Sequence, residues 1–257
     1  MDELTALRLQ IEWGADEAIL DTPIDRLRGG TAPAEVLSPP TTTVLPSRID
    51  AARTSTPGEA QELAGNATSL DTLRATVAAF QGCTLRDTAA HTVLPEGQLT
   101  ARLILIGEAP SADDDRAGRA FSGGQGQFLD KALSGIGLDR DELLIAPLLP
   151  WRPPGDRPPS PSELAICLPF LWRLLTLASG RRALVLGPVA TRAVLGPSRR
   201  VRRGTWVELD IPNRSTKLIV LPSVSLAQTK RTPAMKRELW SDLKRMYRAL
   251  NAEIAQK

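Results

Sequence analysis

Residues 102–126 read RLILIGEAPSADDDRAGRAFSGGQG, and this stretch decides the fold. Residues 103–106 form an unbroken apolar run, which predicts a strand that is buried on both faces. A loop rich in Gly, Ser and Asp follows this run, and residues 125–136 then carry apolar side chains at helical spacing. Because open α/β sheets bind ligands at the carboxyl ends of their strands, we expect the chemistry to lie on this loop.

The chain beyond this stretch continues to alternate apolar runs with helical patterns. Further strands are expected at residues 142–149, 183–186 and 217–221, and a hairpin strand at 204–209. Helices are expected at residues 70–80, after the capping box formed by Ser160 and Glu163, after Gly187-Pro188 and at residues 234–250. This alternation predicts an α/β fold, a three-layer α/β/α sandwich with a four-stranded parallel sheet.

The N-terminal quarter differs from the rest in composition. Residues 4–20 have the pattern of an amphipathic helix, and residues 29–58 are rich in Pro, Thr, Ser and Ala with little periodicity. We therefore expect an N-terminal helical segment at 1–28, a linker at 29–68 and a folded domain at 69–257. The first helix is expected to be tethered, or to dock on a protein partner that the sequence does not identify.

The composition says more about the cellular compartment of the protein than about its binding partner. The chain has 257 residues and a formal net charge of +3, so net charge alone argues only weakly for a polyanionic partner. Its Arg and Lys residues concentrate in 181–203 and 230–248, where they form either solvated faces or phosphate-binding surfaces. Two cysteines fit a reducing cytosol. The first twenty residues do not have the pattern of a positive start followed by an apolar core, and nowhere do eighteen apolar residues run together. We expect a soluble cytoplasmic protein that does not contact a membrane.

The loop after the first strand carries the candidate catalytic groups. Glu108 and residues 113–115 place carboxylates at the strand's carboxyl end, and Phe121 offers a flat apolar face. The alternative is that Glu108 and Asp115 cap backbone amides and that Phe121 is an ordinary core residue.

Six motifs follow one another along the chain: GEAPS at 107–111, DDDRAGRAFSG at 113–123, GQFLDKAL at 126–133, WRPPGDRPPSPSELAICLPFL at 151–171, LVLGPVATRAVLG at 184–196 and LPSVSLAQTKRTPAMKREL at 221–239. In this order they resemble the uracil-DNA glycosylase superfamily, and most of all its family-four type, which carries an iron–sulfur cluster. The resemblance covers about residues 75–250.

The resemblance implies an enzyme that takes a base out of DNA and hydrolyses its glycosidic bond, because that bond cannot be reached inside the stack. Its partner would be single- or double-stranded DNA. The implied catalytic residues, around the attacking water, are Glu108 and Asp115. The implied base-binding residues are Gly107, Ala109, Pro110, Ser111, Phe121 and Ser225. The implied DNA contacts are Ser223, Lys230 and Arg231.

Two positions depart from the family pattern. Pro147 stands where the family has an asparagine that reads the pyrimidine edge, and Ser225 stands where it has a histidine. The one histidine of the chain, His91, lies far upstream. A serine hydroxyl donates one hydrogen bond but cannot supply the charged donor that an imidazole can. Which base is recognised is therefore left open.

The cluster ligands of the family also depart from the pattern. By resemblance, the four ligand positions fall at Phe80, Cys83, Trp151 and Cys167, of which two are cysteines. A four-iron cluster normally takes four thiolates. We therefore expect no cofactor and no metal, with Phe80 and Trp151 filling the space by apolar packing.

These observations predict a DNA base-excision repair N-glycosylase that removes uracil or another damaged base without an iron–sulfur cluster. The main alternative is a non-catalytic descendant that binds DNA, or that binds a protein partner through its N-terminal helix. A third and weaker alternative is hydrolysis of an unrelated nucleoside-like substrate.

Overall fold

The computed structural model of the chain describes residues 56–197, 199–230 and 232–255. The predicted helical segment at 1–28, together with its proposed docking, lies outside the described residues, as does most of the predicted linker. The predicted linker at 29–68 extends too far, because Pro57–Asn66 forms a helix, α2. Thr56 caps this helix by accepting a hydrogen bond from the Glu59 backbone N–H, and Ala60 and Ala64 are buried in the core.

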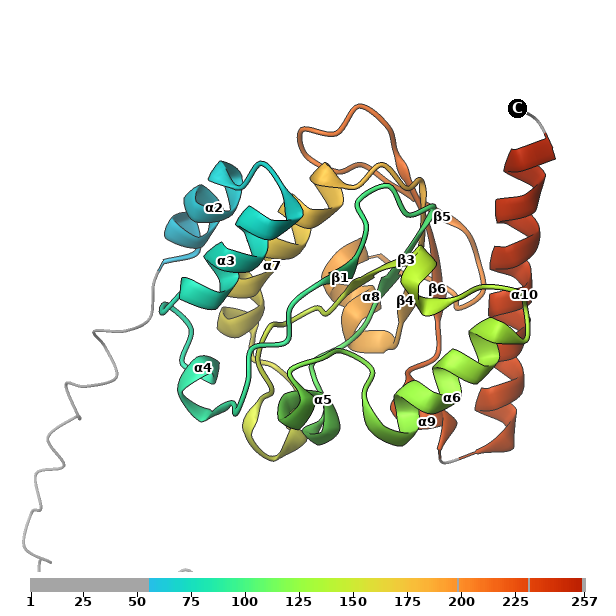
Figure 1. Ribbon diagram of the computed structural model, residues 1–257, viewed down its shortest axis with the longest axis horizontal. Coiled ribbons are helices and arrows are strands. Elements are labelled where there is room, and N and C mark those ends of the chain that lie inside the picture. The colour runs from blue at the N-terminus through green and yellow to red at the C-terminus, as the bar shows by residue number, and fades with distance from the viewer. Residues whose placement is uncertain (1–55, 198, 231, 256–257) are drawn as a thin grey trace, which may run out of the picture. The chain divides into compact units, whose positions relative to one another are not determined.

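A six-stranded mixed sheet lies at the centre of this region (Figure 1). Its strands are β1 (Glu96–Gly97), β2 (Leu103–Ile106), β3 (Leu143–Ala146), β4 (Arg182–Leu186), β5 (Val207–Leu209) and β6 (Leu218–Ser223). Their order is β1-β3-β2-β4-β6-β5, in which the inner four strands run parallel and the two edge strands pair antiparallel. The prediction of a four-stranded parallel sheet is therefore corrected to a mixed sheet with six strands.

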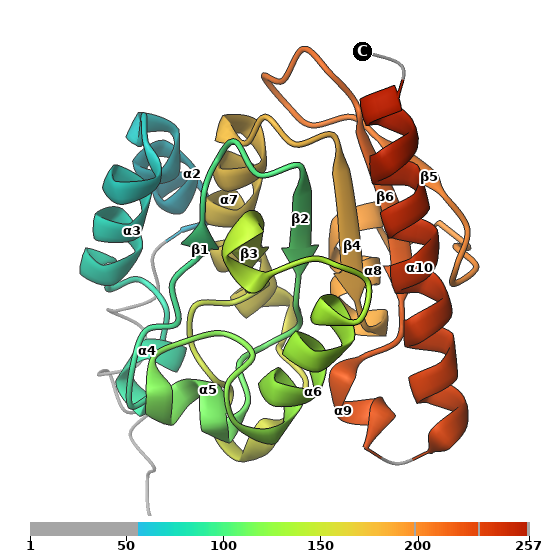
Figure 2. The same ribbon diagram turned by 45° about the vertical axis from the view of Figure 1, so that its right-hand side comes forward.

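Helices cover both faces of the sheet, as the alternation of strands and helices predicts (Figure 2). One face packs against α2, α3 (Leu70–Ala79), α7 (Pro161–Leu177) and α8 (Pro188–Leu195). The other face packs against α6 (Gly123–Ser134), α9 (Leu226–Thr229) and α10 (Pro233–Ala255). The remaining short helices are α4 (Leu85–Thr88), α5 (Ala112–Ala117) and the 3-10 turns η1 (Arg140–Glu142) and η2 (Pro154–Asp156). Among the described helices, none has the length and apolar character that crossing a bilayer requires.

Strand β2 shows why the sequence folds in this way. Its four residues are all buried, with Ile104 and Ile106 in the core on one face and Leu103 and Leu105 in the core on the other. Successive side chains of a strand point to opposite faces, so a run that is apolar at every position fits only a sheet covered on both sides.

The register of the parallel strands brings their carboxyl ends together. Ile106 pairs with Ala146 of β3 and with Val185 of β4, and Leu186 pairs with Ser223 of β6. The segments that follow these strands therefore leave the same edge of the sheet.

Candidate active site

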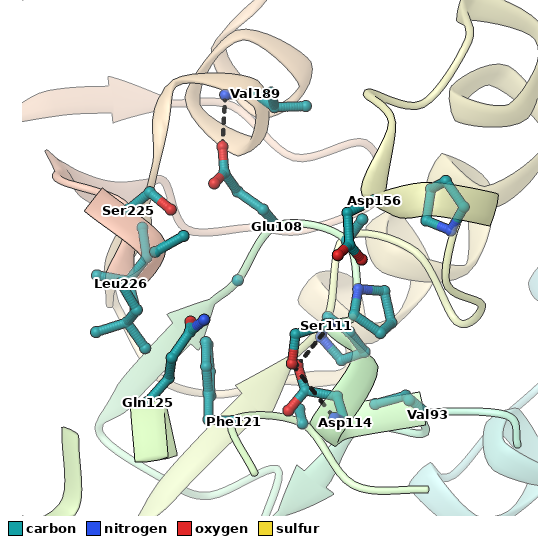
Figure 3. A pocket seen from close by; sticks show the side chains of 18 of the residues that line it. Val93, Glu108, Ser111, Asp114, Phe121, Gln125, Asp156, Val189, Ser225 and Leu226 are labelled. Atoms are coloured by element: carbon teal, nitrogen blue, oxygen red, sulfur yellow. Dashed lines mark hydrogen bonds between the residues drawn. The ribbon is translucent and has the colours of Figure 1, made fainter. Parts of the chain in front are cut away.

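A cavity of about 420 Å³ opens at this edge of the sheet (Figure 3). Its wall is made by the loop after β2, the start of α6, the proline-rich loop after β3 and the first turns of α8 and α9. Gly107, Glu108, Ala109, Pro110, Ser111, Phe121 and Ser225 all line it. The structure therefore brings together every residue that the sequence assigned to base binding. Pro147 is also part of the wall and does not close the cavity.

Phe121 is held in an unusual backbone conformation at the floor of this cavity. Its φ angle is 53°, in the left-handed region that non-glycine residues rarely adopt. Gly126 permits this turn, because a Cβ atom there would overlap the Phe121 carbonyl oxygen. Gly107 permits the ring's position, because a Cβ atom there would lie 2.7 Å from Phe121 Cζ. The two glycines thus let the aromatic ring lie directly over the end of β2.

Glu108 lies at the amino terminus of α8. Its Oε1 atom accepts a hydrogen bond from the Val189 backbone N–H at 2.9 Å, where the helix dipole favours a negative charge. Gly187 makes room for it, because a Cβ atom there would overlap the Glu108 carboxylate. Its Oε2 atom accepts no hydrogen bond from the part of the chain that the structure describes. One carboxylate oxygen therefore orients the side chain and the other stays available.

Asp114 connects the two ends of the loop that carries Phe121. Its Oδ2 atom accepts from the Ser111 backbone N–H at 2.8 Å and from the Ser111 hydroxyl at 2.9 Å, forming a capping box at the start of α5. Its Oδ1 atom accepts from the Ser122 backbone N–H at 2.6 Å. Both oxygens of this cavity-lining carboxylate are therefore engaged in holding the loop.

The predicted catalytic role of Asp115 is corrected by its position. Asp115 is not in the cavity wall, and its Oδ1 atom accepts from the backbone N–H groups of Ala90 and His91 at 2.9 and 3.2 Å. The residue is buried and ties the preceding segment to α5. This is the capping role that the sequence left open as the alternative.

The three residues predicted to contact DNA differ in their exposure and in whether the structure describes them. Ser223 is buried, and its hydroxyl donates to Asp242 Oδ2 at 2.7 Å, so it is not on a surface that DNA can reach. Burial raises the pKa of Asp242 above the ordinary aspartate value. Lys230 is exposed and directly follows α9, whose Leu226 lines the cavity. Arg231 lies outside the described residues.

Sequence reasoning missed several residues of the cavity wall. Gln125, Asp156, Arg157 and Val189 all line it, in loops or first helical turns that follow strand ends. Their placement after those strands was the available signal, but nothing in the sequence says which of their side chains turn inward.

Arg157 illustrates how the proline-rich loop is fixed. Its Nη1 and Nη2 atoms donate to the two oxygens of Glu163 at 2.9 and 2.6 Å. Glu163 Oε2 also accepts from the Ser160 backbone N–H at 2.7 Å, completing the predicted capping box of α7. The Arg157 guanidinium lowers the pKa of Glu163 to about 2. The loop is therefore anchored to α7 by a charged pair beside the cavity.

Comparison with known proteins gives a consistent result. The family model described as the uracil DNA glycosylase superfamily matches residues 94–244. A Type-4 uracil-DNA glycosylase of Pyrobaculum aerophilum is 35% identical over 113 residues, covering 44% of this chain and 58% of the relative. Proteins of the same name are 27% identical in Sulfurisphaera tokodaii, covering 69% of this chain and 83% of the relative, and 32% identical in Archaeoglobus fulgidus, covering 49% and 63%. The chain thus spans less than two thirds of the first and third of these relatives.

These comparisons contradict one prediction. We expected no cofactor, whereas the relatives are Type-4 proteins, the iron–sulfur type of the family. The expectation rested on counting cysteines in one sequence, and similarity to the iron–sulfur type overturns it.

The described residues at the corresponding place do not themselves fit a four-thiolate cluster. Cys83 and Cys167 are buried with their Sγ atoms 4.0 Å apart, and the described part of the chain has no group of three or more potential metal ligands. The hydrogen bond with Cys83, together with burial, raises the pKa of the Cys167 thiol. The rings of Phe80 and Trp151 stack in the same core, with centroids 6.4 Å apart.

Proposed function

The chain belongs to the uracil DNA glycosylase superfamily, and from this premise we propose that it hydrolyses the N-glycosidic bond of uracil in DNA. The observation that carries the proposal is the open cavity at the sheet edge, with the Phe121 ring and the Glu108 carboxylate both in its wall. The printed name shared by the similar proteins supports the same activity.

Recognition would begin with extrusion of the base from the DNA stack into this cavity. The Phe121 ring supplies a flat apolar surface for the base, and Pro147 and Leu226 supply further apolar wall. The Ser225 hydroxyl lies in the same wall and can donate one hydrogen bond to a base oxygen.

Hydrolysis would then break the bond between C1′ of the sugar and N1 of uracil. The bonding electron pair leaves with the base, and positive charge develops on the sugar. Glu108 would stabilise this charge and orient the attacking water through Oε2, while Oε1 remains fixed by Val189. Water adds its oxygen to C1′ and loses a proton, and the departing uracil anion takes up a proton at N1, giving free uracil and an abasic site.

DNA would approach along the surface next to α9. Lys230 is exposed just beyond the turn that lines the cavity, where it can contact a phosphate. Base-excision repair is the process in which such an activity would act.

The proposal is tested with single-stranded and duplex oligonucleotides that carry one uracil, by measuring strand cleavage at the resulting abasic site. Glu108→Gln keeps an oxygen that can accept from Val189 and removes the charge, so we expect kcat to fall about a hundredfold or more. Asp115→Asn is the matched control, because it removes a charge outside the cavity and should change kcat much less. Wild-type kcat in Glu108→Gln would contradict the assigned role.

A second candidate is a non-catalytic protein that binds DNA through the same cavity. It is favoured by one observation, that Glu108, Asp114 and Asp115 all accept hydrogen bonds from backbone N–H groups. Tight binding of the uracil oligonucleotide without product would support this candidate against the enzyme.

A further inference from the structure

Most polar side chains in the cavity wall are already engaged with other protein groups. Both oxygens of Asp114 accept backbone hydrogen bonds, and Asp156 Oδ1 accepts from Arg152 Nε at 2.7 Å. Arg157 donates through both terminal nitrogens to Glu163. These groups maintain the shape of the wall, and their bonds would have to break before they could bind a ligand.

Gln125 differs from these residues. Its side-chain amide forms no hydrogen bond with the part of the chain that the structure describes, although the residue is half-buried and lines the cavity. An amide that loses water without gaining a partner costs free energy, so this group is suited to a ligand that supplies one.

The position of Gln125 relative to the Phe121 ring is fixed by the backbone. Phe121 directly precedes Ser122, the N-cap of α6, and Gln125 lies in the first turn of that helix, where the close approach of Gly126 to the Phe121 carbonyl sets the turn. Figure 3 shows the Gln125 side chain alongside the Phe121 ring, on the side of Leu226. One edge of a base that stacks on the Phe121 ring would therefore lie next to the Gln125 amide.

The chemistry of the amide selects a class of base. It offers one carbonyl acceptor and an N–H donor side by side in one plane. The complementary edge has a ring N–H next to an exocyclic carbonyl oxygen, as in uracil and in the deaminated purine hypoxanthine.

We propose that Gln125 recognises the base by pairing its amide with this N–H and carbonyl edge. The inference rests on the proposed function and deepens it, by naming the residue that selects the base and the edge that it reads. The amide carbonyl accepts from the ring N–H, and the amide N–H donates to the adjacent carbonyl oxygen.

The test compares uracil with 3-methyluracil, in which a methyl group replaces the hydrogen of the N–H that Gln125 would bind. Each base is placed in a single-stranded oligonucleotide on a 2′-fluorinated sugar, where the electron-withdrawing fluorine slows bond cleavage so that Kd can be measured. Excision from the corresponding ordinary deoxyribose oligonucleotides is measured in parallel. The variants of the full chain are Gln125→Leu and, as a matched control on the exposed side of the same helix, Gln127→Leu.

We expect the wild-type protein and Gln127→Leu to bind the uracil oligonucleotide about tenfold or more tighter than the methylated one, as one or two hydrogen bonds to a desolvated group provide. In Gln125→Leu this ratio should fall to within about threefold of unity, because the leucine side chain cannot distinguish the two edges. An unchanged Tm in both variants establishes that the fold is kept.

The outcomes separate the two claims. If the wild-type protein excises uracil and Gln125→Leu still discriminates, the inference is overturned while the proposed function stands. If no uracil is released but discrimination is present and is lost in Gln125→Leu, the proposed function fails and the base-reading role stands. Absence of discrimination in the wild-type protein overturns the inference.

Discussion

Phe121 holds a backbone φ of 53°, a conformation that costs about 1–3 kcal/mol for a residue with a side chain. Arg140 offsets part of this cost. Its Nη1 atom donates to the Phe121 carbonyl at 3.1 Å, and its Nη2 atom donates to the Ala120 carbonyl. Only 12% of the Arg140 side chain is exposed, so these bonds are partly shielded from water. Arg140 is therefore a positioning residue for the aromatic ring.

Replacing Arg140 by Met leaves two carbonyl groups without this donor. We expect the free energy of unfolding to fall by about 2–3 kcal/mol, the cost of unsatisfied buried acceptors, and KM for the uracil oligonucleotide to rise. Urea denaturation and steady-state kinetics measure the two effects. Arg119→Met is the control, since Arg119 is 55% exposed and its ion pair with Glu96 should contribute at most about 1 kcal/mol. Equal losses in the two variants would contradict the positioning role.

The sequence predicted which loop residues would lie together at the sheet better than it predicted the direction of the carboxylates. Residues 107–111 and Phe121 follow a strand buried on both faces, so their place at the sheet edge follows from local pattern. Asp114 and Asp115 are neighbours in sequence, yet one lines the cavity and the other binds the backbone at residues 90–91. The direction of the Asp115 side chain depends on its contact with residues 90–91, which lie well before it in the chain, and the pattern of the sequence around Asp115 does not show that contact.

The proline-rich loop and α7 are connected by the pair of Arg157 and Glu163. Arg157 lowers the pKa of Glu163 from 4.5 to about 2, so the charged form is favoured in the folded state. For a carboxyl whose pKa is lowered by folding, the stabilisation is present above the unfolded value and is lost as pH falls toward the folded value. Protein stability should therefore decline between pH 4.5 and about 2 in part through this residue.

Glu163→Gln should remove that part of the acid decline and lower the free energy of unfolding at neutral pH by about 1 kcal/mol. The expected loss is modest because the Arg157 side chain is 45% exposed, so solvent screens the ion pair. Urea unfolding at several pH values measures both effects. Glu142→Gln is the control. Glu142 also closes a capping box, accepting from the Asp139 backbone N–H at 3.0 Å, and has no arginine partner among the described residues. A steeper decline at acid pH in Glu163→Gln would contradict this explanation.

Strands and helices were predicted correctly where burial produces a clear pattern of apolar residues. The four inner strands are apolar at nearly every position because both of their faces are covered. Strand β1 has two residues, Glu96 and Gly97, and forms by pairing with β3 rather than through its own pattern. Helix α2 lies at the end of a segment whose composition resembles a linker, and it is stabilised by packing against α7.

At the scale of the whole described region, the parallel strands bring distant segments to one cavity. Gly107, Pro147, Val189 and Ser225 come from four different connections and share its wall. The α/β class could be predicted from the alternation of strands and helices, and with it the edge of the sheet at which the cavity lies, whereas the mixed six-stranded sheet could not. The volume of the cavity and the groups left free within it depend on side-chain packing across those connections.

The central claim is that this cavity receives a base extruded from DNA. The most direct measurement is a crystal structure of Glu108→Gln bound to a single-stranded oligonucleotide that carries one uracil. We predict uracil inside the cavity, with its ring against Phe121 and its N–H and carbonyl edge at Gln125. Bound DNA with the uracil outside, while the cavity remains accessible, would contradict the account.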